Sequence, residues 1–341
     1  MLLFAAHNFT IFEVLIRIGF ILYHMEQIDW KHLPFKYTKT DVNVRCIYKD
    51  GKWGELEFSN SEFIQMHIAA TCLHYGQECF EGLKAYKGKD GRIRLFRWQE
   101  NVKRMQNSAK GISMPIVPEE IFGKAIKEAV IRNKQYVPPY GTGAALYIRP
   151  LLIGTGAEIG VKAANEYTFM VMVTPVGPYY KNGFETVDLM IVRNFDRTAP
   201  LGTGSYKIGG NYAASLNSLN DCHHAGYTTA LFLDAKEKKY IDEAGTANFF
   251  GIKNNTYITP KSEAILPSIT NKSLVAIAEE LGMNVERRPV AVDELDTFEE
   301  AGACGTAAVI SPIASIYDPG NQKTYTFSKD KNPGPLTTKL Y

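Results

Sequence analysis

Residues 205–212 read SYKIGGNY and place a single lysine, Lys207, in a run with no other charged side chain. An apolar setting disfavours the ammonium form of lysine and favours the neutral amine, a nucleophile that forms a Schiff base with an aldehyde. The two glycines that follow let the backbone approach a flat ligand without an intervening Cβ atom. The alternative is a glycine turn between a strand and a helix that leaves Lys207 in solvent. This stretch alone does not separate the two interpretations.

The bulk properties indicate a soluble protein of two domains. The chain has 341 residues, which is too many for one ordinary core. A hydrophobic content of 45% with 22% charged residues is typical of globular proteins. The net charge of +2 gives no general attraction to nucleic acid or to acidic membranes. The five cysteines include no C-x-x-C pair, so we expect reduced thiols in a cytoplasmic protein and no metal site.

Turn signals and composition divide the chain into four parts. We expect residues 1–29 to be an extension outside the fold and residues 30–175 to form a smaller α/β domain. The Pro- and Gly-containing stretch 176–183 is the predicted linker, and residues 184–341 form the predicted larger domain.

The extension contains an apolar run, residues 9–23, that is too short to span a membrane and carries Glu13 and Arg17. An amphipathic helix or a membrane anchor are possible interpretations. We expect instead that Met25 is the natural start and that the residues before it come from an early start assignment.

Hydrophobic periodicity predicts helices and strands along both folded parts. The expected helices cover residues 98–110, 119–133, a stretch from about 211, and 271–281. The expected strands cover residues 42–48, 93–97, 144–153, 167–173, 187–193, 229–233, 240–242, 248–252, 256–259 and 309–310.

Two segments have the features of a phosphate site. Residues 265–270 lead directly into a predicted helix, whose first N–H groups and dipole favour an anion. The small-residue turn CGTAA at 304–308 offers a hydroxyl and further N–H groups. Each has an ordinary alternative, an N-cap at Ser268 or Thr270 and a glycine turn before a strand. Arg104 lies on a predicted helix and, taken alone, is better explained as a solvated surface arginine.

One carboxylate, Glu243, stands beside small residues in the run IDEAGTANFF at 241–250. A carboxylate that faces a pyridine nitrogen keeps it protonated, and the ring then accepts electrons. The alternative is an acid at the end of a hairpin. Other templates fit poorly, because the chain has no P-loop, no H-E-x-x-H, no G-x-S-x-G and only two of the three glycines of a dinucleotide loop.

Taken together these segments resemble the branched-chain aminotransferases, which are fold-type IV pyridoxal-phosphate enzymes. The resemblance runs from about Trp30 to the C-terminus. It is carried by Tyr75, FEGLKAY at 80–86, YIRPLLIG at 147–154, YKIGGNY at 206–212, EAGTAN at 243–248, ILP at 265–267 and GTA at 305–307. It implies an α/β (α+β) fold of two domains, like that of D-amino-acid aminotransferase, with pyridoxal 5'-phosphate at the domain interface.

The resemblance also implies a role for each matching residue at the cofactor. Lys207 would hold the cofactor aldehyde as a Schiff base and then move the proton between the substrate Cα and the cofactor C4′. Tyr212 would bind the ring hydroxyl and Glu243 the ring nitrogen. The implied phosphate ligands are Arg104, the backbone at Ile269 and Thr270, and Thr306.

The implied reaction moves an amino group between branched-chain L-amino acids (Leu, Ile, Val) and 2-oxoglutarate, giving branched 2-oxo acids and L-glutamate. The implied substrate-binding residues are Tyr75, Phe80, Tyr147, Arg149, Tyr179, Thr246 and Ala307. Thr246 and Ala307 would lie at the substrate carboxylate, and Arg149 or nearby tyrosine hydroxyls at the distal carboxylate of glutamate. A homodimer is implied, with Tyr75 and its neighbours closing the pocket of the other subunit.

Alternatives and departures remain. A D-amino-acid transaminase or an aminodeoxychorismate lyase shares this fold, although segments 80–86 and 147–154 favour the branched-chain type. A cofactor-binding protein without turnover is the other alternative, since family members usually continue beyond residue 341 and the C-terminal tail looks truncated. Some relatives carry a redox C-x-x-C where this chain has Ala308 and Ser311, so we expect no thiol switch there.

Overall fold

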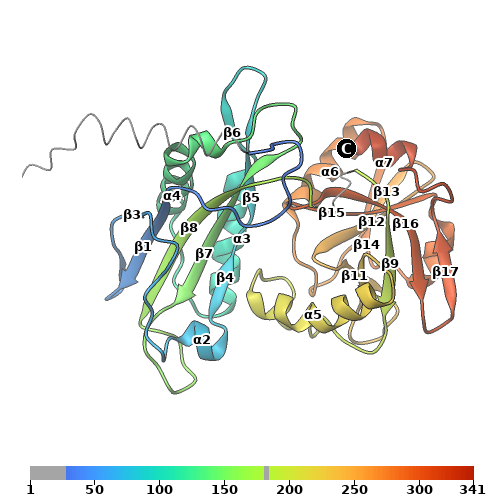
Figure 1. Ribbon diagram of the computed structural model, residues 1–341. Helices are drawn as coiled ribbons and strands as arrows, with labels where there is room; N and C mark the ends of the chain where they lie inside the picture. Colours follow the sequence, from blue (N-terminus) through green and yellow to red (C-terminus); the bar gives the residue numbers. More distant parts are fainter. Residues whose placement is uncertain (1–27, 180–183) are drawn as a thin grey trace, which may run out of the picture.

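The computed structural model describes residues 28–179 and 184–341, which form two β-sheets with helices packed on them (Figure 1). Residues 1–27 of the predicted extension, which include the proposed start at Met25, and residues 180–183 of the predicted linker lie outside the described residues. No helix in the described ranges is long and apolar enough to cross a membrane. No group of three or more His, Cys, Asp or Glu side chains in those ranges could hold a metal ion.

The first sheet has eight antiparallel strands, in the order β2-β1-β8-β7-β5-β6, with β3 beside β1 and β4 beside β7. Its strands are β1 (Asn43–Lys49), β2 (Lys52–Trp53), β3 (Glu57–Ser59), β4 (Glu78–Phe80), β5 (Leu83–Lys87), β6 (Ile93–Leu95), β7 (Ala145–Gly154) and β8 (Glu166–Val176). The turn between β1 and β2 has positive φ at Asp50 and Gly51, as a tight hairpin requires.

Two long helices cover one face of this sheet, α3 (Trp98–Gly111) and α4 (Glu119–Arg132). Their buried residues recur at helical spacing, for example Val102, Met105 and Ala109 on α3. These residues pack with Phe122 of α4 and Phe169 of β8 in one core. A short helix, α2 (Thr71–Tyr75), and a 3-10 turn (Lys134–Tyr136) complete this half.

The second sheet has nine strands of mixed direction, in the order β11-β10-β9-β16-β15-β12-β13-β14, with β17 beside β16. Because β11 also pairs with β12, six of its strands close into a ring. Its strands are β9 (Val187–Val192), β10 (Thr229–Leu233), β11 (Ile241–Ala244), β12 (Ala247–Lys253), β13 (Thr256–Pro260), β14 (Asn284–Arg288), β15 (Glu300–Gly305), β16 (Val309–Asp318) and β17 (Lys323–Thr326).

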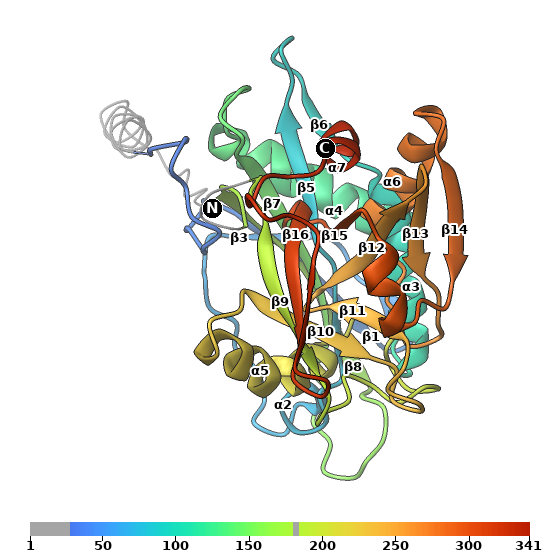
Figure 2. The same ribbon diagram turned by 90° about the vertical axis from the view of Figure 1, so that its right-hand side faces the viewer.

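The helices of this half are α5 (Gly209–His224), α6 (Ile269–Glu280) and α7 (Pro335–Leu340), with a 3-10 helix at Val292–Thr297. Figure 2 shows α5 lying across the lower end of β9 and β10. Strand β9 pairs with β10 on one side and with β16 on the other. The segment that begins α5 therefore reaches the side of the sheet that faces the first half, as Figure 1 shows.

Most predicted elements are confirmed, with small shifts at their ends. Helices α3 and α4 match their predicted ranges, whereas α5 and α6 each begin about two residues earlier than expected. Strand β8 continues to Val176, which pairs with Ala145, so strand pairing extends one residue into the predicted linker. Sequence periodicity missed the helices α2 and α7 and the strands β2, β3, β4, β5, β14, β15 and β17. The limits of the two domains stay a prediction.

Candidate active site

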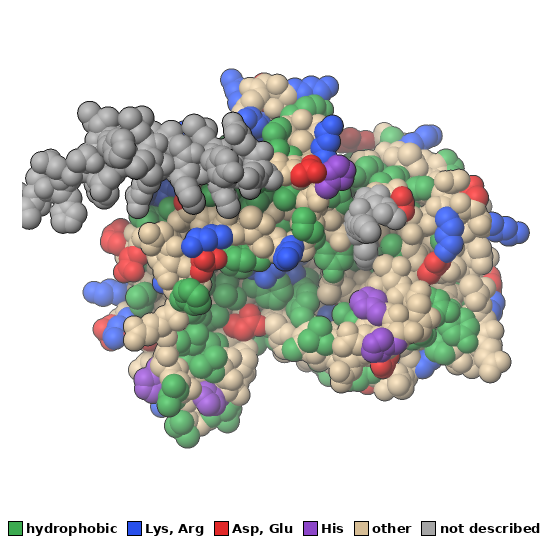
Figure 3. All heavy atoms as spheres, viewed as in Figure 1, with side chains coloured by type: hydrophobic (Ala, Val, Ile, Leu, Met, Phe, Trp, Pro, Cys, Tyr) green, Lys and Arg blue, Asp and Glu red, His purple; other side chains and the backbone are tan. Residues whose placement is uncertain are grey.

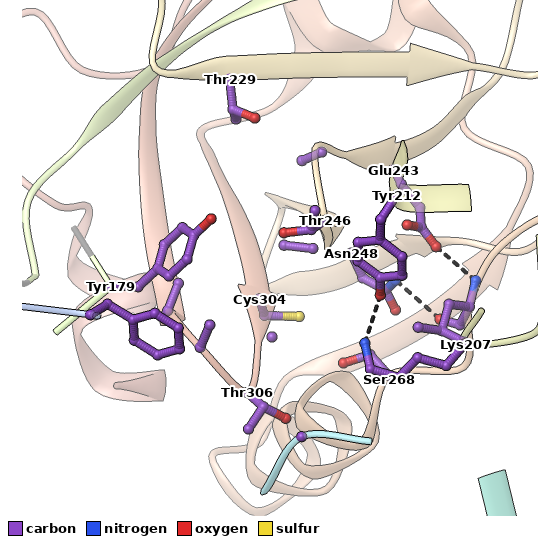
Figure 4. Close-up of a pocket in the computed structure, with 18 of the residues that line it drawn as sticks. Tyr179, Lys207, Tyr212, Thr229, Glu243, Thr246, Asn248, Ser268, Cys304 and Thr306 are labelled. Atoms are coloured by element: carbon purple, nitrogen blue, oxygen red, sulfur yellow. Dashed lines mark hydrogen bonds between the residues drawn. The ribbon is translucent and has the colours of Figure 1, made fainter. Parts of the chain in front are cut away.

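A cavity of about 730 Å³ lies between the two halves of the molecule. Side chains from both halves form its walls, and Figure 4 shows several of those from the second half directed toward one another. The predicted site residues among its walls are Phe80, Arg104, Tyr147, Arg149, Tyr179, Lys207, Tyr212, Glu243, Thr246, Thr306 and Ala307. Residues separated by more than 200 positions in the sequence thus line one space.

Lys207 stands just before the first turn of α5, and Tyr212 stands within that helix. The Lys207 amine donates a hydrogen bond of 2.6 Å to the Tyr212 hydroxyl (Figure 4) and lies 4.6 Å from the centre of the Phe80 ring. Burial lowers the pKa of Lys207 to about 7, and the positive charge of Arg104 adds to the shift. The alternative of a solvated lysine is wrong, and the amine is available in its neutral form near pH 7.

Tyr212 is held in a fixed orientation beside this amine. Its ring makes an edge contact with Phe80, with ring centres 5.0 Å apart. Burial raises the pKa of its hydroxyl above the usual range, and the charge of Glu243 contributes. The hydroxyl therefore keeps its proton, so it can accept from Lys207 and still donate to another oxygen.

Glu243 lies on β11 and is almost completely buried. Its Oε1 atom accepts a hydrogen bond of 2.7 Å from the Leu266 N–H and lies 3.5 Å from Nη2 of Arg197. Burial raises the pKa of Glu243, while the charge of Arg197 partly opposes the rise. A carboxylate with this raised proton affinity is suited to hold a proton between itself and a ring nitrogen.

Arg104 is a buried residue of an ion pair rather than a solvated arginine. Its Nε and Nη2 atoms each donate to Glu81 at 2.8 Å, and its Nη1 donates to the Pro267 carbonyl at 3.1 Å. Glu81 is fully buried and also accepts from Asn101 at 2.7 Å. A guanidinium has five N–H bonds, so two remain for an anion in the cavity.

The start of α6 and the β15–β16 turn approach the cavity from the second half. Ser268 caps α6 by accepting from the Asn271 N–H at 3.1 Å, so the alternative of an N-cap at Ser268 is correct. The N–H groups of Ile269 and Thr270, at the first two helical positions, have no partner within the helix. Ser268 and Thr306 line the cavity, whereas Ile269 and Thr270 do not.

All but one of the predicted substrate-binding residues line the cavity. Tyr147 and Arg149 are two positions apart on β7, so their side chains share one face of the strand. Arg149 donates a hydrogen bond to the Tyr147 hydroxyl at 2.9 Å. Phe80 and Tyr179 lie near them, and Thr246 and Ala307 line the opposite wall. Tyr75 lies on α2, outside this cavity of its own chain, and donates to the Ile159 carbonyl.

The family model for amino-transferase class IV matches residues 78–316, which include every element that lines the cavity from β4 to β16. The chain belongs to the class IV aminotransferases.

Curated relatives of this class IV aminotransferase cover nearly its whole length. The branched-chain-amino-acid aminotransferase of Haemophilus influenzae is 49% identical over 93% of this chain and 94% of the relative. That of Helicobacter pylori is 46% identical over 93% of each chain.

Solved structures of branched-chain amino acid aminotransferases also align with most of this chain. The Escherichia coli branched-chain amino acid aminotransferase aligns with a TM-score of 0.73 at 27% identity, over 89% of this chain and 92% of that one. The T.th. branched-chain amino acid aminotransferase, complexed with N-(5'-phosphopyridoxyl)-L-glutamate, aligns with a TM-score of 0.74 at 29% identity, over the same shares. These matches confirm the predicted α/β (α+β) fold of type IV.

Sequence reasoning missed several residues of this class IV aminotransferase site. Arg197 beside Glu243, Glu81 beside Arg104, and Phe35 beside Tyr147 and Tyr179 are all contacts between distant segments. Glu81 lies in the segment FEGLKAY at 80–86, and burial of Arg104 would have indicated a carboxylate partner. Arg197 and Phe35 lie in segments with no motif or periodicity, so nothing in the sequence indicates them.

Proposed function

We propose that this aminotransferase moves the amino group between branched-chain L-amino acids (Leu, Ile, Val) and 2-oxoglutarate, with pyridoxal 5'-phosphate as its cofactor. The observation that carries the proposal is the Lys207 amine, bonded to Tyr212 in a cavity that also holds Glu243 and Arg104. The relatives at 49% and 46% identity are named for this activity, and a related structure contains a phosphopyridoxyl compound of glutamate.

The residues present fit this cofactor. The two remaining N–H bonds of Arg104, the start of α6 and the Thr306 hydroxyl converge on the cavity and suit a phosphate. Glu243 is the buried carboxylate for the ring nitrogen, and Tyr212 the hydroxyl for the ring oxygen. When bound, pyridoxal phosphate supplies an electron-accepting ring that stabilises negative charge at the substrate Cα.

Proton transfer is assigned to Lys207. A pKa of about 7 leaves a large share of the amine neutral at neutral pH, so it can accept the Cα proton and return it. Tyr212 fixes the direction of the amine through their 2.6 Å hydrogen bond. Arg197, 3.5 Å from Glu243, favours the charged form of that carboxylate, which would then keep the ring nitrogen of the bound cofactor protonated.

The substrate walls suit both an aliphatic and an acidic side chain. Phe35, Tyr147 and Tyr179 form an aromatic cluster, with ring centres 5.2 to 5.4 Å apart, that excludes water from a branched side chain. Arg149 lies against this cluster, and its buried Nε atom has no hydrogen-bond partner within the described residues. We assign the Arg149 guanidinium, which lines the cavity, to the distal carboxylate of glutamate or 2-oxoglutarate.

The absorbance spectrum before and after an amino acid is added tests this function. Purified protein should show the visible band of the lysine-bound cofactor, and L-leucine without an oxo acid should replace it with the band of the amine form. D-leucine should leave the band unchanged. A response to D-leucine alone would indicate a D-amino-acid transaminase, and a band that no amino acid alters would indicate a binding protein without turnover.

We also propose that the protein is a homodimer in which the lobe around α2 contacts the second copy. This lobe exposes a run of large apolar side chains, and Figure 3 shows hydrophobic and histidine side chains over it. Phe63, Ile68, Leu73, Ile159 and Val161 are each at least 60% exposed, which is unusual for a surface that stays in water.

Tyr75 belongs to the same lobe, so the contact would carry it toward the pocket of the second copy. Light scattering tests the dimer. The wild-type protein should have twice the mass of one chain, and Ile68→Glu should shift the mass toward that of one chain. A wild-type monomer would contradict the proposal.

Finally, we propose a cytoplasmic location. All five cysteines are free thiols in the structure, as expected in a reducing compartment. Fractionation of cells that express the protein, followed by immunodetection, tests this location.

A further inference from the structure

The backbone on either side of Lys207 is bonded to the opposite half of the molecule. The Lys207 N–H donates to the Ser108 hydroxyl at 2.8 Å, and the Lys207 carbonyl accepts from the Phe80 N–H at 3.1 Å. Two residues later, the Gly209 N–H donates to the Glu78 carboxylate. All three partners lie on β4 or α3, elements of the first half.

The side chains next to Lys207 follow the same pattern. Ile208 is buried in the hydrophobic core of the first half, and Tyr206 packs against that core. The Tyr206 ring also lies against Gly111 at the end of α3, where an added Cβ would come within 2.4 Å of the ring. Residues 206–208 are therefore docked on the first half, although the chain continues into α5 of the second.

Helix α3 connects this docking to the cofactor site. Ser108 lies one turn after Arg104 and donates to its carbonyl at 3.0 Å while it accepts from Lys207. The same turn of helix thus presents the guanidinium assigned to the cofactor phosphate and the acceptor that holds the lysine backbone. Glu243, assigned to the cofactor ring, lies on the other half.

We propose that the first half positions the catalytic lysine through Ser108, Phe80 and Glu78, and that Ser108 is a positioning residue for Lys207. This inference rests on the proposed role of Lys207 in transamination. Loss of the Ser108 hydroxyl leaves the Lys207 N–H without its acceptor, and the segment that carries the amine shifts. The side chains assigned to the substrate, namely Phe35, Phe80, Tyr147, Arg149 and Tyr179, do not depend on this hydrogen bond and stay in place.

The test compares Ser108→Ala with a matched control, Ser273→Ala. Ser273 is also a helical serine that donates to the carbonyl four residues earlier, at 3.0 Å, and accepts from the opposite half, at 2.6 Å from Arg97. It does not contact Lys207. The two variants therefore remove the same chemistry at the interface, and only one of them removes the contact with Lys207.

We expect Ser108→Ala to lower kcat with L-leucine by about tenfold or more, because small misplacements of a reacting group are costly. The KM for L-leucine should stay within about twofold, since the substrate walls are unchanged. Backbone hydrogen exchange of the holoenzyme should be faster over residues 204–213. Ser273→Ala should match the wild type in all three measurements.

A Ser108→Ala protein with wild-type kcat and wild-type exchange over residues 204–213 would overturn the proposal. So would an equal loss of kcat in Ser273→Ala. If Ser108→Ala does not fold, Glu78→Gln replaces it, because it weakens the bond to Gly209 while keeping side-chain size. We then expect a kcat about threefold lower and faster exchange over the same residues, since a charged acceptor forms a stronger bond than a neutral one.

The exchange measurement keeps this inference separate from the proposed function. If the wild-type protein lacks leucine activity, the function fails, while the exchange comparison still shows whether Ser108 holds the Lys207 segment.

Discussion

The two walls of the active-site cavity are built in different ways. The first half presents long side chains from antiparallel strands and a helix, namely Phe80, Arg104, Tyr147 and Arg149. The second half presents turns and a helix start with short side chains, such as Thr246, Ser268, Thr306 and Ala307. A wall of long side chains sets which substrate shape and charge fit, whereas a wall of turns offers fixed N–H groups to anions.

Because of this difference, we expect mutations in the two walls to affect different steps of the reaction. Changes in the first wall should alter affinity and specificity, since the contacts there are made by side-chain atoms. Changes in the charged residues of the second half should alter the chemical step, since Glu243 is proposed to bind the nitrogen of the cofactor ring. Lys207 belongs to both, because its amine faces the cavity and its backbone is held by the first half.

Replacing Lys207 is the strongest test, since it removes the group that joins the two walls. Lys207→Ala should lower turnover by at least about a thousandfold, because it removes both the nucleophile and the proton acceptor. Part of the cofactor affinity should remain through Arg104 and α6. Turnover of amino acid and phosphate bound per chain are the measurements, and near-normal turnover would remove Lys207 from the mechanism.

Replacing Glu243 tests the chemical role of the second half. Glu243→Gln keeps the size and the bond to Leu266 but removes the charge, and we expect kcat to fall by about a hundredfold with little change in KM. Asp242→Asn is the matched control. It changes the neighbouring acid on the other face of β11, which bonds to Ser262 at 2.9 Å. Equal losses in the two variants would contradict the assignment.

The pH dependence of cofactor uptake tests the environment of Lys207. Because its pKa is lowered to about 7, the neutral fraction of the amine rises about tenfold between pH 6 and pH 8 and then levels off. The rate at which the cofactor-free protein forms the visible band should follow that curve.

An exposed lysine would instead continue to gain reactivity up to about pH 10. The reaction of an N-acetyl-lysine amide with pyridoxal phosphate gives this reference. A protein rate that keeps rising with the reference above pH 8 would show that burial does not lower the pKa of Lys207.

A glycine in the first wall gives the smallest of the expected effects. A Cβ atom at Gly82 would lie 2.2 Å from the Tyr147 hydroxyl, so Gly82→Ala must move that ring. We expect the KM for L-leucine to rise by about fivefold with a smaller change in kcat, as for a loss of substrate binding.

Gly160→Ala is the control for Gly82→Ala, because an added Cβ there meets no atom within 4 Å and the residue does not line the cavity. It should leave both constants unchanged. A fall in kcat with unchanged KM in Gly82→Ala would break the distinction between the two walls.

The sequence predicts the reactive centre better than its support. Lys207, Tyr212 and Glu243 stand in short motifs, and α3 and α4 show clear helical spacing. By contrast, Ser108 meets Lys207 across 99 positions, and no local pattern encodes such a contact. Tertiary packing decides these contacts.

The missed strands have a similar physical explanation. Strand β15 consists mostly of small residues buried on both faces, so it shows no alternation. Strand β14 lies at the end of the sheet and is mostly exposed, so it shows no apolar face. Periodicity detects elements with one buried face, and neither strand has that property.

The closed ring of strands in the second half has a consequence for synthesis of the chain. Strand β9 has its two neighbours in β10 and β16, so the ring cannot close until residue 318 has left the ribosome. The first sheet needs only residues up to 176, and the Lys207 segment follows soon after. Lys207 can therefore meet Ser108, Phe80 and Glu78 while most of the sheet that carries Glu243 is not yet synthesised. The candidate active site is completed in the order in which the chain emerges.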